Sequence, residues 1–389
     1  MAMANSSKFH VVMFPWFATT SPSSILPKKA QPQLQHLNLH PTLISFHPLT
    51  IPHVDGLPPG AETASDVPIF LHHLLATAMD RITDQVEAAL RALKPDFFPV
   101  CAAAFAYNFV PAQQIRLKLA NSSWPPPGYP SSTVVLGPHE ARLLQFLLFP
   151  FGEDITFHKR LTAAIKRGDI VAIGTCQEVK GPFCGYMERQ FGKPMFVTGP
   201  VLLAPSPLAP EDRRAQWLGG FKPGSVIFCA FGSQNFPEKD RFQELLLGFE
   251  RTGLPFPAAL KPPLGAATIE EALPEGFQER VGGRGVVHGG WVPQPSILCH
   301  PSVGCFVSHC GFGSIWESLM SDPQIVLREE NGWVSKESLC KAIKSVMDEE
   351  IEVGCLVKKN HAEWKETPMS QGFMCNYIDN FVRQILDLK

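Results

Sequence analysis

The sequence predicts an α/β protein built on parallel β-sheets, and three observations support this fold class. Short apolar runs typical of buried parallel strands recur at residues 225–231, 256–260, 286–288 and 303–307. Helical patterns lie between them, as at residues 238–251, which is the alternation expected of βαβ units. The chain has 389 residues, more than one ordinary domain needs, so we expect two domains.

The composition limits the class of protein. Hydrophobic residues make up 45% and charged residues 18%, which is typical of a globular chain rather than a disordered one. The formal net charge is −2 without a basic block, so we expect no nucleic-acid partner. No apolar run reaches the ~18–20 residues that span a bilayer, and Pro15 interrupts the apolar patch near the N-terminus. We expect a cytoplasmic monomer without a transmembrane segment.

The cysteines favour free thiols over disulfides or a metal site. Ten cysteines are scattered without paired spacing, which favours a reducing compartment. The tightest group, Cys299, Cys305 and Cys310 near His300 and His309, could suggest a metal site, but its spacings match no zinc pattern. Since Cys305 falls inside a predicted strand, buried thiols are the favoured reading.

A glycine-rich turn follows the predicted strand at residues 303–307. The turn reads HCGFGS, and a helical pattern begins after it. Glycines between a strand and a helix bring backbone N–H groups and the positive end of the helix dipole close to an anion, typically a phosphate. His309 and Ser314 add side-chain donors, and Glu317, one helical turn further, can accept hydrogen bonds from ribose hydroxyls. The alternative is an ordinary core strand followed by a turn.

Two other segments add groups that suit a nucleotide. Trp291 offers a flat face for a base, and Gln294 offers an amide for the base edge or the sugar. Ser233 follows the strand at residues 225–231 in a second strand-to-loop corner, where it could also be a plain turn serine. The candidate site for a nucleotide diphosphate therefore comprises eight residues: Ser233, Trp291, Gln294, His309, Gly311, Gly313, Ser314 and Glu317.

The order of these residues, with His300, Pro301 and Gly304 among them, resembles the signature of plant family-1 UDP-glycosyltransferases. Three local sequences resemble the branch that adds a second sugar to flavonoid or anthocyanidin glycosides: GFGS at 311–314, FPWF at 14–17 and PPGYP at 126–130. The chain has no GxSxG elbow, GxxxxGK[ST] loop or HExxH motif, so other familiar enzyme classes fit less well.

The resemblance implies a donor, an acceptor and a role for each site residue. The donor would be a UDP-sugar and the acceptor a small phenolic glycoside, with inversion at the sugar and without a cofactor or metal. Trp291 would stack on uracil, while Gln294 and Glu317 would hold the ribose. His309 and Ser314 would hold the diphosphate, and Ser233 would belong to the same donor site.

The resemblance also implies a GT-B type fold, in which two Rossmann-like domains face each other across a cleft. We expect an incomplete acceptor-side domain at residues 1–202 and a proline-rich linker at 203–215. The UDP-sugar-binding domain would span residues 216–370. A C-terminal helix at 371–389 would pack back on the N-terminal domain.

Three segments of the family pattern have no counterpart in the chain. The segment after the predicted strand at 9–14 would carry the histidine that deprotonates the acceptor, and neither His10 nor His36 matches it. A second would carry the aspartate that orients this histidine, and Asp96 aligns only with its start. A third, after residues 325–327, would carry the pair that binds the sugar. We therefore assign no catalytic residue, and the alternative function is a UDP-binding pseudoenzyme or an incomplete gene model.

Overall fold

The computed structural model describes residues 25–27, 47–63, 66–82, 97–98, 102–111, 124–137, 141–142, 144–150, 155–167, 169–200, 207–232, 237–321, 324–326, 335–348 and 350–387. The chain forms two compact units. The first comprises Met1–Val134, Arg142–Ile173 and Pro182–Phe196, and the second comprises Val135–Ala141, Gly174–Gly181 and Val197–Lys389. The predicted domain boundaries stay a prediction, and the centre of the predicted linker, residues 203–206, lies outside the described residues.

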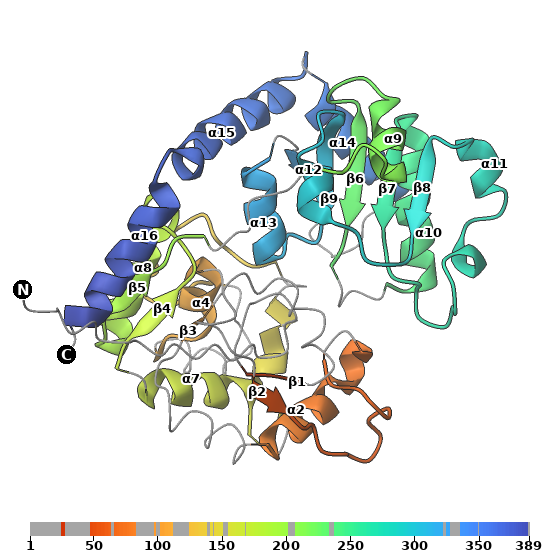
Figure 1. Cartoon of the computed structure of the whole chain (residues 1–389). Coiled ribbons are helices and arrows are strands. Elements are labelled where there is room, and N and C mark those ends of the chain that lie inside the picture. The colour runs from red at the N-terminus through yellow and green to blue at the C-terminus, as the bar shows by residue number, and fades with distance from the viewer. Residues whose placement is uncertain are drawn as a thin grey trace, which may run out of the picture. The chain divides into compact units, whose positions relative to one another are not determined.

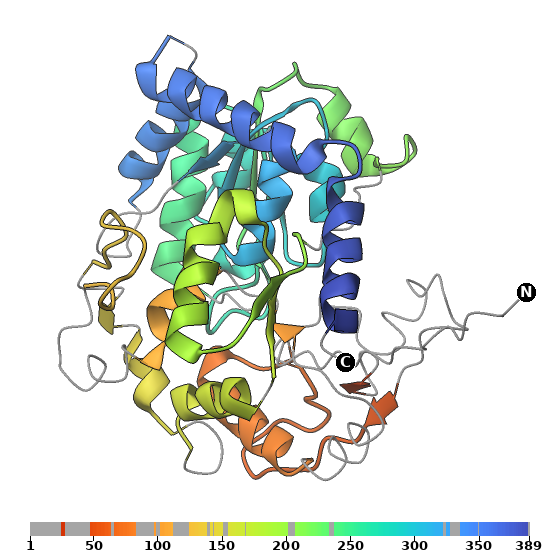
Figure 2. The same cartoon turned by 90° about the vertical axis from the view of Figure 1, so that its left-hand side faces the viewer.

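The first unit contains short parallel strands with helices around them. Strands β1 (Ile25–Pro27) and β2 (His47–Leu49) pair in parallel. A three-stranded sheet has the order β3-β4-β5, formed by Phe97–Phe98, Val171–Ile173 and Met195–Val197. Every residue of β4 is buried, as its apolar sequence predicts. The helices are α2 (His72–Asp80), α4 (Ala102–Asn108), α7 (Phe157–Arg167) and α8 (Gln177–Phe191), the last seen from the front in Figure 2.

Predictions for the first unit had mixed outcomes. Helical patterns in the sequence predict helices at 155–165 and 178–191, and both are confirmed as α7 and α8. A third helical pattern predicts a helix at 138–148, which is wrong in its last turns, where Leu144–Leu148 forms a 3-10 helix. The sequence also predicts a long helix at 66–93, and the described part of this range holds a 3-10 helix at Ile69–Leu71 followed by α2. The predicted strand at 9–14, His10, His36 and Asp96 lie outside the described residues.

The second unit is organised around a five-stranded parallel sheet (Figure 1). Its order is β10-β9-β6-β7-β8, and every neighbouring pair runs in parallel. The strands are β6 (Val226–Ala230), β7 (Phe256–Ala259), β8 (Gly285–His288), β9 (Val303–Ser308) and β10 (Gln324–Val326). This topology confirms the predicted α/β class with parallel sheets.

Helices cover both faces of this sheet. Those with core residues against it are α9 (Arg213–Gly219), α10 (Lys239–Thr252), α12 (Gln294–Leu298) and α14 (Lys336–Met347). The other helices of this part of the chain are α11 (Phe277–Val281), α13 (Phe312–Leu319), α15 (Glu352–Met369) and α16 (Phe373–Asp387). One core cluster joins α10 and α14 to the sheet through Phe242, Leu246, Phe249, Leu339 and Ile343. The other joins α9 and α12 through Leu218, Ile297 and Leu298, with Phe228 and Phe306 stacked at 5.4 Å. The sheet is therefore the middle layer of three.

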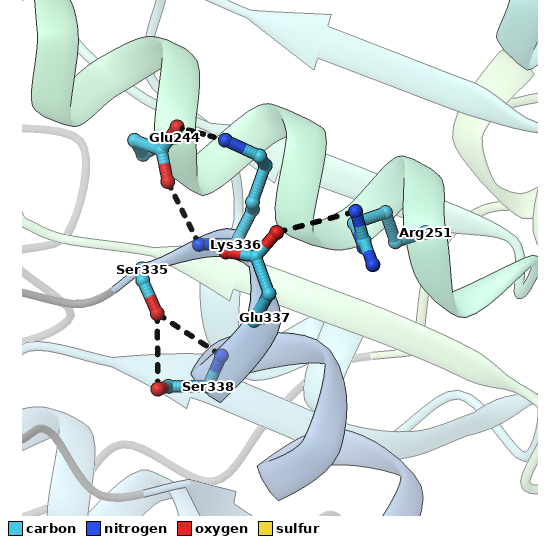
Figure 3. Close-up of polar contacts among 6 residues, drawn as sticks. All are labelled: Glu244, Arg251, Ser335, Lys336, Glu337 and Ser338. Carbon is cyan, nitrogen blue, oxygen red and sulfur yellow. Dashed lines mark hydrogen bonds and ion pairs between the residues drawn. The ribbon is translucent and has the colours of Figure 1, made fainter.

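Polar contacts fix the start of α14 on α10 (Figure 3). The Lys336 ammonium lies 2.6 Å from one oxygen of Glu244, and the Lys336 backbone N–H donates to the other at 3.0 Å. Ser335 is the N-cap, and its hydroxyl accepts from the Ser338 N–H at 3.2 Å, which satisfies one orphan donor of the first turn. These bonds set the residue at which α14 begins.

Across the ranges that the structure describes, the helices are too short or too polar to serve as membrane spans.

Candidate nucleotide-binding site

The carboxyl ends of the parallel strands place three loops at one edge of the second sheet. The loop after β6 begins with Phe231 and Gly232, the loop after β8 contains Trp291, and the turn after β9 contains His309 and Gly311. Strands β6 and β9 are direct neighbours, so the first and third loops adjoin. Ligands of open α/β sheets bind at this edge. Ser233, predicted to lie here, is outside the described residues.

The imidazole of His309 is exposed but lies against two glycines. A Cβ added to Gly311 would lie 2.5 Å from His309 Nε2, and one added to Gly232 would lie 3.0 Å from His309 Cε1. Gly232 also has a φ of +70°, a conformation that side chains rarely adopt. Residues with side chains at either position would push the imidazole out of place. The sequence indicates a strand-to-loop corner here, but it does not predict that Gly232 lies against the His309 imidazole.

The turn between β9 and α13 exposes the start of a helix. Cys310 has a φ of +56°, and its N–H donates to Ser308 Oγ at 3.2 Å. Gly311 is the N-cap of α13 and makes no side-chain cap hydrogen bond. At Gly313 an added Cβ would meet no atom within 4 Å. With no side-chain cap at Gly311, the first N–H groups of α13 and its positive dipole end are suited to an anion.

The structure brings together three of the predicted residues. Gln294, the first residue of α12, donates from Nε2 to Glu317 Oε2 at 2.6 Å and to Ser314 Oγ at 3.3 Å. Ser314 is buried, and burial raises the pKa of the Glu317 carboxyl, while the hydrogen bond from Gln294 opposes that shift. Gln294 binds only Oε2 of Glu317. The other carboxylate oxygen, Oε1, can therefore still accept hydrogen bonds from a pair of hydroxyls.

Trp291 lies in the segment that joins β8 to α12. Strand β8 is at one end of the sheet, whereas α12 packs on β6 and β9, so this segment crosses the carboxyl edge. The Trp291 side chain is 83% exposed. An open indole face on this segment is suited to stacking on a base. Its role remains a prediction.

The cysteines and histidines near the site have structural partners. Cys305 is fully buried in β9, and burial raises the pKa of its thiol to about 12. His300 Nδ1 accepts from the Ser302 N–H at 3.2 Å, which holds the turn before β9. Among the described residues, no cluster of three histidine, cysteine or carboxylate side chains could hold a metal ion.

Sequence comparisons identify relatives over nearly the whole chain. Residues 281–328, which contain most of the site, match the family UDP-glucoronosyl and UDP-glucosyl transferase. UDP-glycosyltransferase 79B9 of Arabidopsis thaliana is 48% identical over 447 residues, covering 98% of each chain. Anthocyanidin 3-O-glucoside 2'''-O-xylosyltransferase of the same organism is 45% identical over 457 residues, again covering 98% of each chain. Since both stretches exceed the 389 residues of this chain, they include positions for which the chain has no residue.

Structural comparison agrees with the predicted fold. Glycyrrhiza uralensis UGT73P12, complexed with glycyrrhetinic acid 3-O-monoglucuronide, matches with a TM-score of 0.72 at 18% identity, covering 93% of this chain and 89% of the other. TcCGT1 in complex with UDP matches with a TM-score of 0.69 at 15% identity, covering 92% and 90%. These matches confirm the GT-B type α/β fold. With the sequence identities near one half over almost the full length, the chain belongs to the plant family-1 UDP-glycosyltransferases.

Proposed function

We propose that the chain binds a UDP-sugar at the carboxyl edge of its second sheet and transfers the sugar, with inversion, to a hydroxyl of a flavonoid or anthocyanidin glycoside. The observation that carries the donor part is the bond between Gln294 and Glu317 beside the open N-terminus of α13. The acceptor class follows the name of one relative, an anthocyanidin 3-O-glucoside xylosyltransferase. We further propose that the protein acts as a cytoplasmic monomer.

The roles of the site residues follow from their positions. Transfer leaves a UDP diphosphate with new negative charge, and preorganised donors aimed at this charge lower the barrier. The N–H groups of α13, with Ser314 and His309 beside them, are suited to bind the diphosphate. The Glu317 carboxylate is suited to the ribose hydroxyls and Trp291 to uracil. Donors of this kind neutralise a diphosphate without a metal ion, so we propose a metal-independent reaction.

A second candidate function is UDP binding without sugar transfer. The relatives carry residues at positions where this chain has none, and we place these positions after residue 14, after Asp96 and after residue 327. Two of these segments would supply the acceptor base and its orienting carboxylate. A positioned base contributes about 10²–10⁴-fold to rate, so a chain without one would bind UDP and turn over slowly or not at all.

One experiment separates the two candidates. The purified chain is titrated with UDP by calorimetry, then incubated with UDP-glucose, UDP-xylose or UDP-rhamnose and an anthocyanidin 3-O-glucoside, with products detected by mass spectrometry. Binding with transfer supports the first function, and binding without transfer supports the second. The absence of UDP binding would contradict both.

Two variants locate the binding. Glu317→Gln removes the charged acceptor for the ribose hydroxyls and should weaken UDP binding by about 10-fold or more, since hydrogen bonds to charged groups contribute about 1.5–3 kcal/mol. Glu211→Gln makes the same change at an exposed position outside the site and serves as the matched control. Equal UDP affinities for the two variants would place the ribose elsewhere.

A further inference from the structure

We propose that His361 of α15 is a positioning residue for nucleotide binding, because its imidazole fixes the helix that carries Ser314 and Glu317. This inference rests on the proposed donor site and adds a residue outside the signature at 291–317. His361 lies 44 positions after Glu317 in the printed sequence, and no sequence pattern links the two.

A direct hydrogen bond joins His361 to α13. His361 Nε2 lies 2.9 Å from the carbonyl oxygen of Ser318, and since a carbonyl only accepts, Nε2 carries the proton. Ser318 is fully buried in the last turn of α13, and its carbonyl also accepts from the Ser321 N–H at 3.0 Å, so the imidazole is its second donor. The neighbouring Glu317 carbonyl accepts from Ser321 Oγ at 2.7 Å. His361 and Ser321 thus bind successive carbonyls at this helix end.

The two ends of α13 have different tasks. Its N-terminal half carries Ser314 and leads to Glu317, both bonded to Gln294. Another side of α13 packs against α16: Trp316 lies in one apolar cluster with Phe373, and Phe312 and Leu319 pack on it. Because α13 has only eight residues, its orientation depends on such neighbours more than on its own hydrogen bonds.

Helix α15 has little core packing to hold it in place. Of its 18 residues only Gly354 and Pro368 are buried. A cavity of about 670 Å³ lies between it and the amino edge of the sheet, lined among others by Gly304, Met347 and His361. Figures 1 and 2 show that α16 follows α15 after a bend, and the His361 bond ties the loosely packed α15 to α13.

The link from His361 to the site is short. Ser318 directly follows Glu317, so a shift of the Ser318 carbonyl moves the backbone that carries the Glu317 carboxylate. Without the His361 side chain, the buried Ser318 carbonyl loses one of its hydrogen-bond donors. This loss favours a shift of the C-terminal end of α13. The distance from Glu317 Oε2 to Gln294 Nε2 would change with it.

The test compares His361→Ala with His361→Gln in the full chain. With UDP as the probe in calorimetry, His361→Ala should bind about 3–10-fold more weakly, the effect of one net hydrogen bond. His361→Gln, whose amide can donate to the same carbonyl, should recover most of the affinity. Lys359→Ala, at an exposed position on the same helix, is the matched control and should bind as the parent does.

Hydrogen exchange of the free proteins supplies a second readout. In His361→Ala the amides of α13 should exchange faster than in the parent, while those of α10 remain unchanged. Unaltered exchange in α13, or equal UDP affinity for His361→Ala and the parent, would overturn the positioning role. Failure of the parent itself to bind UDP would contradict the proposed function, which the exchange measurement does not depend on.

Discussion

Gln294 Nε2 lies 2.6 Å from Glu317 Oε2, which joins the first residue of α12 to the second half of α13. The two residues are far apart in the chain but meet because α12 and α13 pack together beside β9. The bond holds the half-buried carboxylate in one orientation before any ligand arrives. Such preorganisation lowers the entropic cost of binding.

Replacing Gln294 by alanine should weaken both the site and the fold. Glu317 would lose a donor while it stays buried, and leaving a charged group without that partner costs about 1.5–3 kcal/mol. We expect a lower melting temperature and at least a several-fold weaker affinity for UDP, measured by calorimetry. Gln278→Ala, at an exposed position of α11, is the control. If the two variants melt alike, the bond does not contribute to stability.

Glu317→Gln should make stability less dependent on pH. The raised pKa of Glu317 means that the folded protein binds this proton more tightly than the unfolded chain does. Burial of the charge therefore costs stability that grows as the pH rises above the ordinary pKa of 4.5, is complete above the raised pKa, and is absent below 4.5. The variant should melt higher than the parent at pH 8, and the difference should shrink toward pH 4. A constant difference across this range would contradict the assignment.

Alanine at Gly311 and at Gly313 should have opposite effects on stability. At Gly311 the new methyl would lie 2.5 Å from His309 Nε2, and crowding of this kind typically costs about 1–3 kcal/mol. At Gly313 no atom lies within 4 Å, and alanine is the better helix former by about 1 kcal/mol. Thermal unfolding of the two variants without ligand checks this. A more stable Gly311→Ala variant would show that the imidazole is not confined by the glycine.

The ion pair between Glu244 and Lys336 should stabilise the protein in a pH-dependent way. Hydrogen bonds from Lys336 lower the pKa of Glu244, so the pair contributes above the ordinary pKa of 4.5 and is lost as the pH falls through the lowered value. Glu244→Gln should melt slightly below the parent at pH 7 and like the parent near pH 3. Glu238→Gln, in an exposed pair with Arg241, is the control. If Glu238→Gln lowers the melting temperature as much as Glu244→Gln does, the pair with Lys336 stabilises the protein no more than an exposed ion pair.

Much of the second unit was predictable because burial in a parallel sheet leaves a strong signal. Strands such as β6 and β9 are buried nearly throughout and therefore appear as apolar runs. The long helices α10 and α14 each bury one apolar face against the sheet, so their apolar residues recur at helical spacing. Helices α9, α11 and α12 were missed, since five to seven residues span too few turns to show a period.

The candidate site was predictable in its residue types but not in its contacts. Gln294 and Glu317 were both assigned to the ribose, and the structure shows that they bind each other. The close approach of Gly232 to the His309 imidazole could not be predicted from the sequence, because it depends on β6 and β9 being neighbours. The bond from His361 also arises only from tertiary packing, as a single histidine on a helix carries no pattern of its own.

The strand order of the second sheet has a consequence for how such a protein can change. The described groups at the nucleotide corner, from Gly232 to Glu317, come from loops on a single sheet and from the helices packed on it. Losses confined to the first unit leave this corner with the loops and helices of its own sheet. Proteins of this design can therefore lose the residues needed for sugar transfer first and still recognise nucleotides long afterwards.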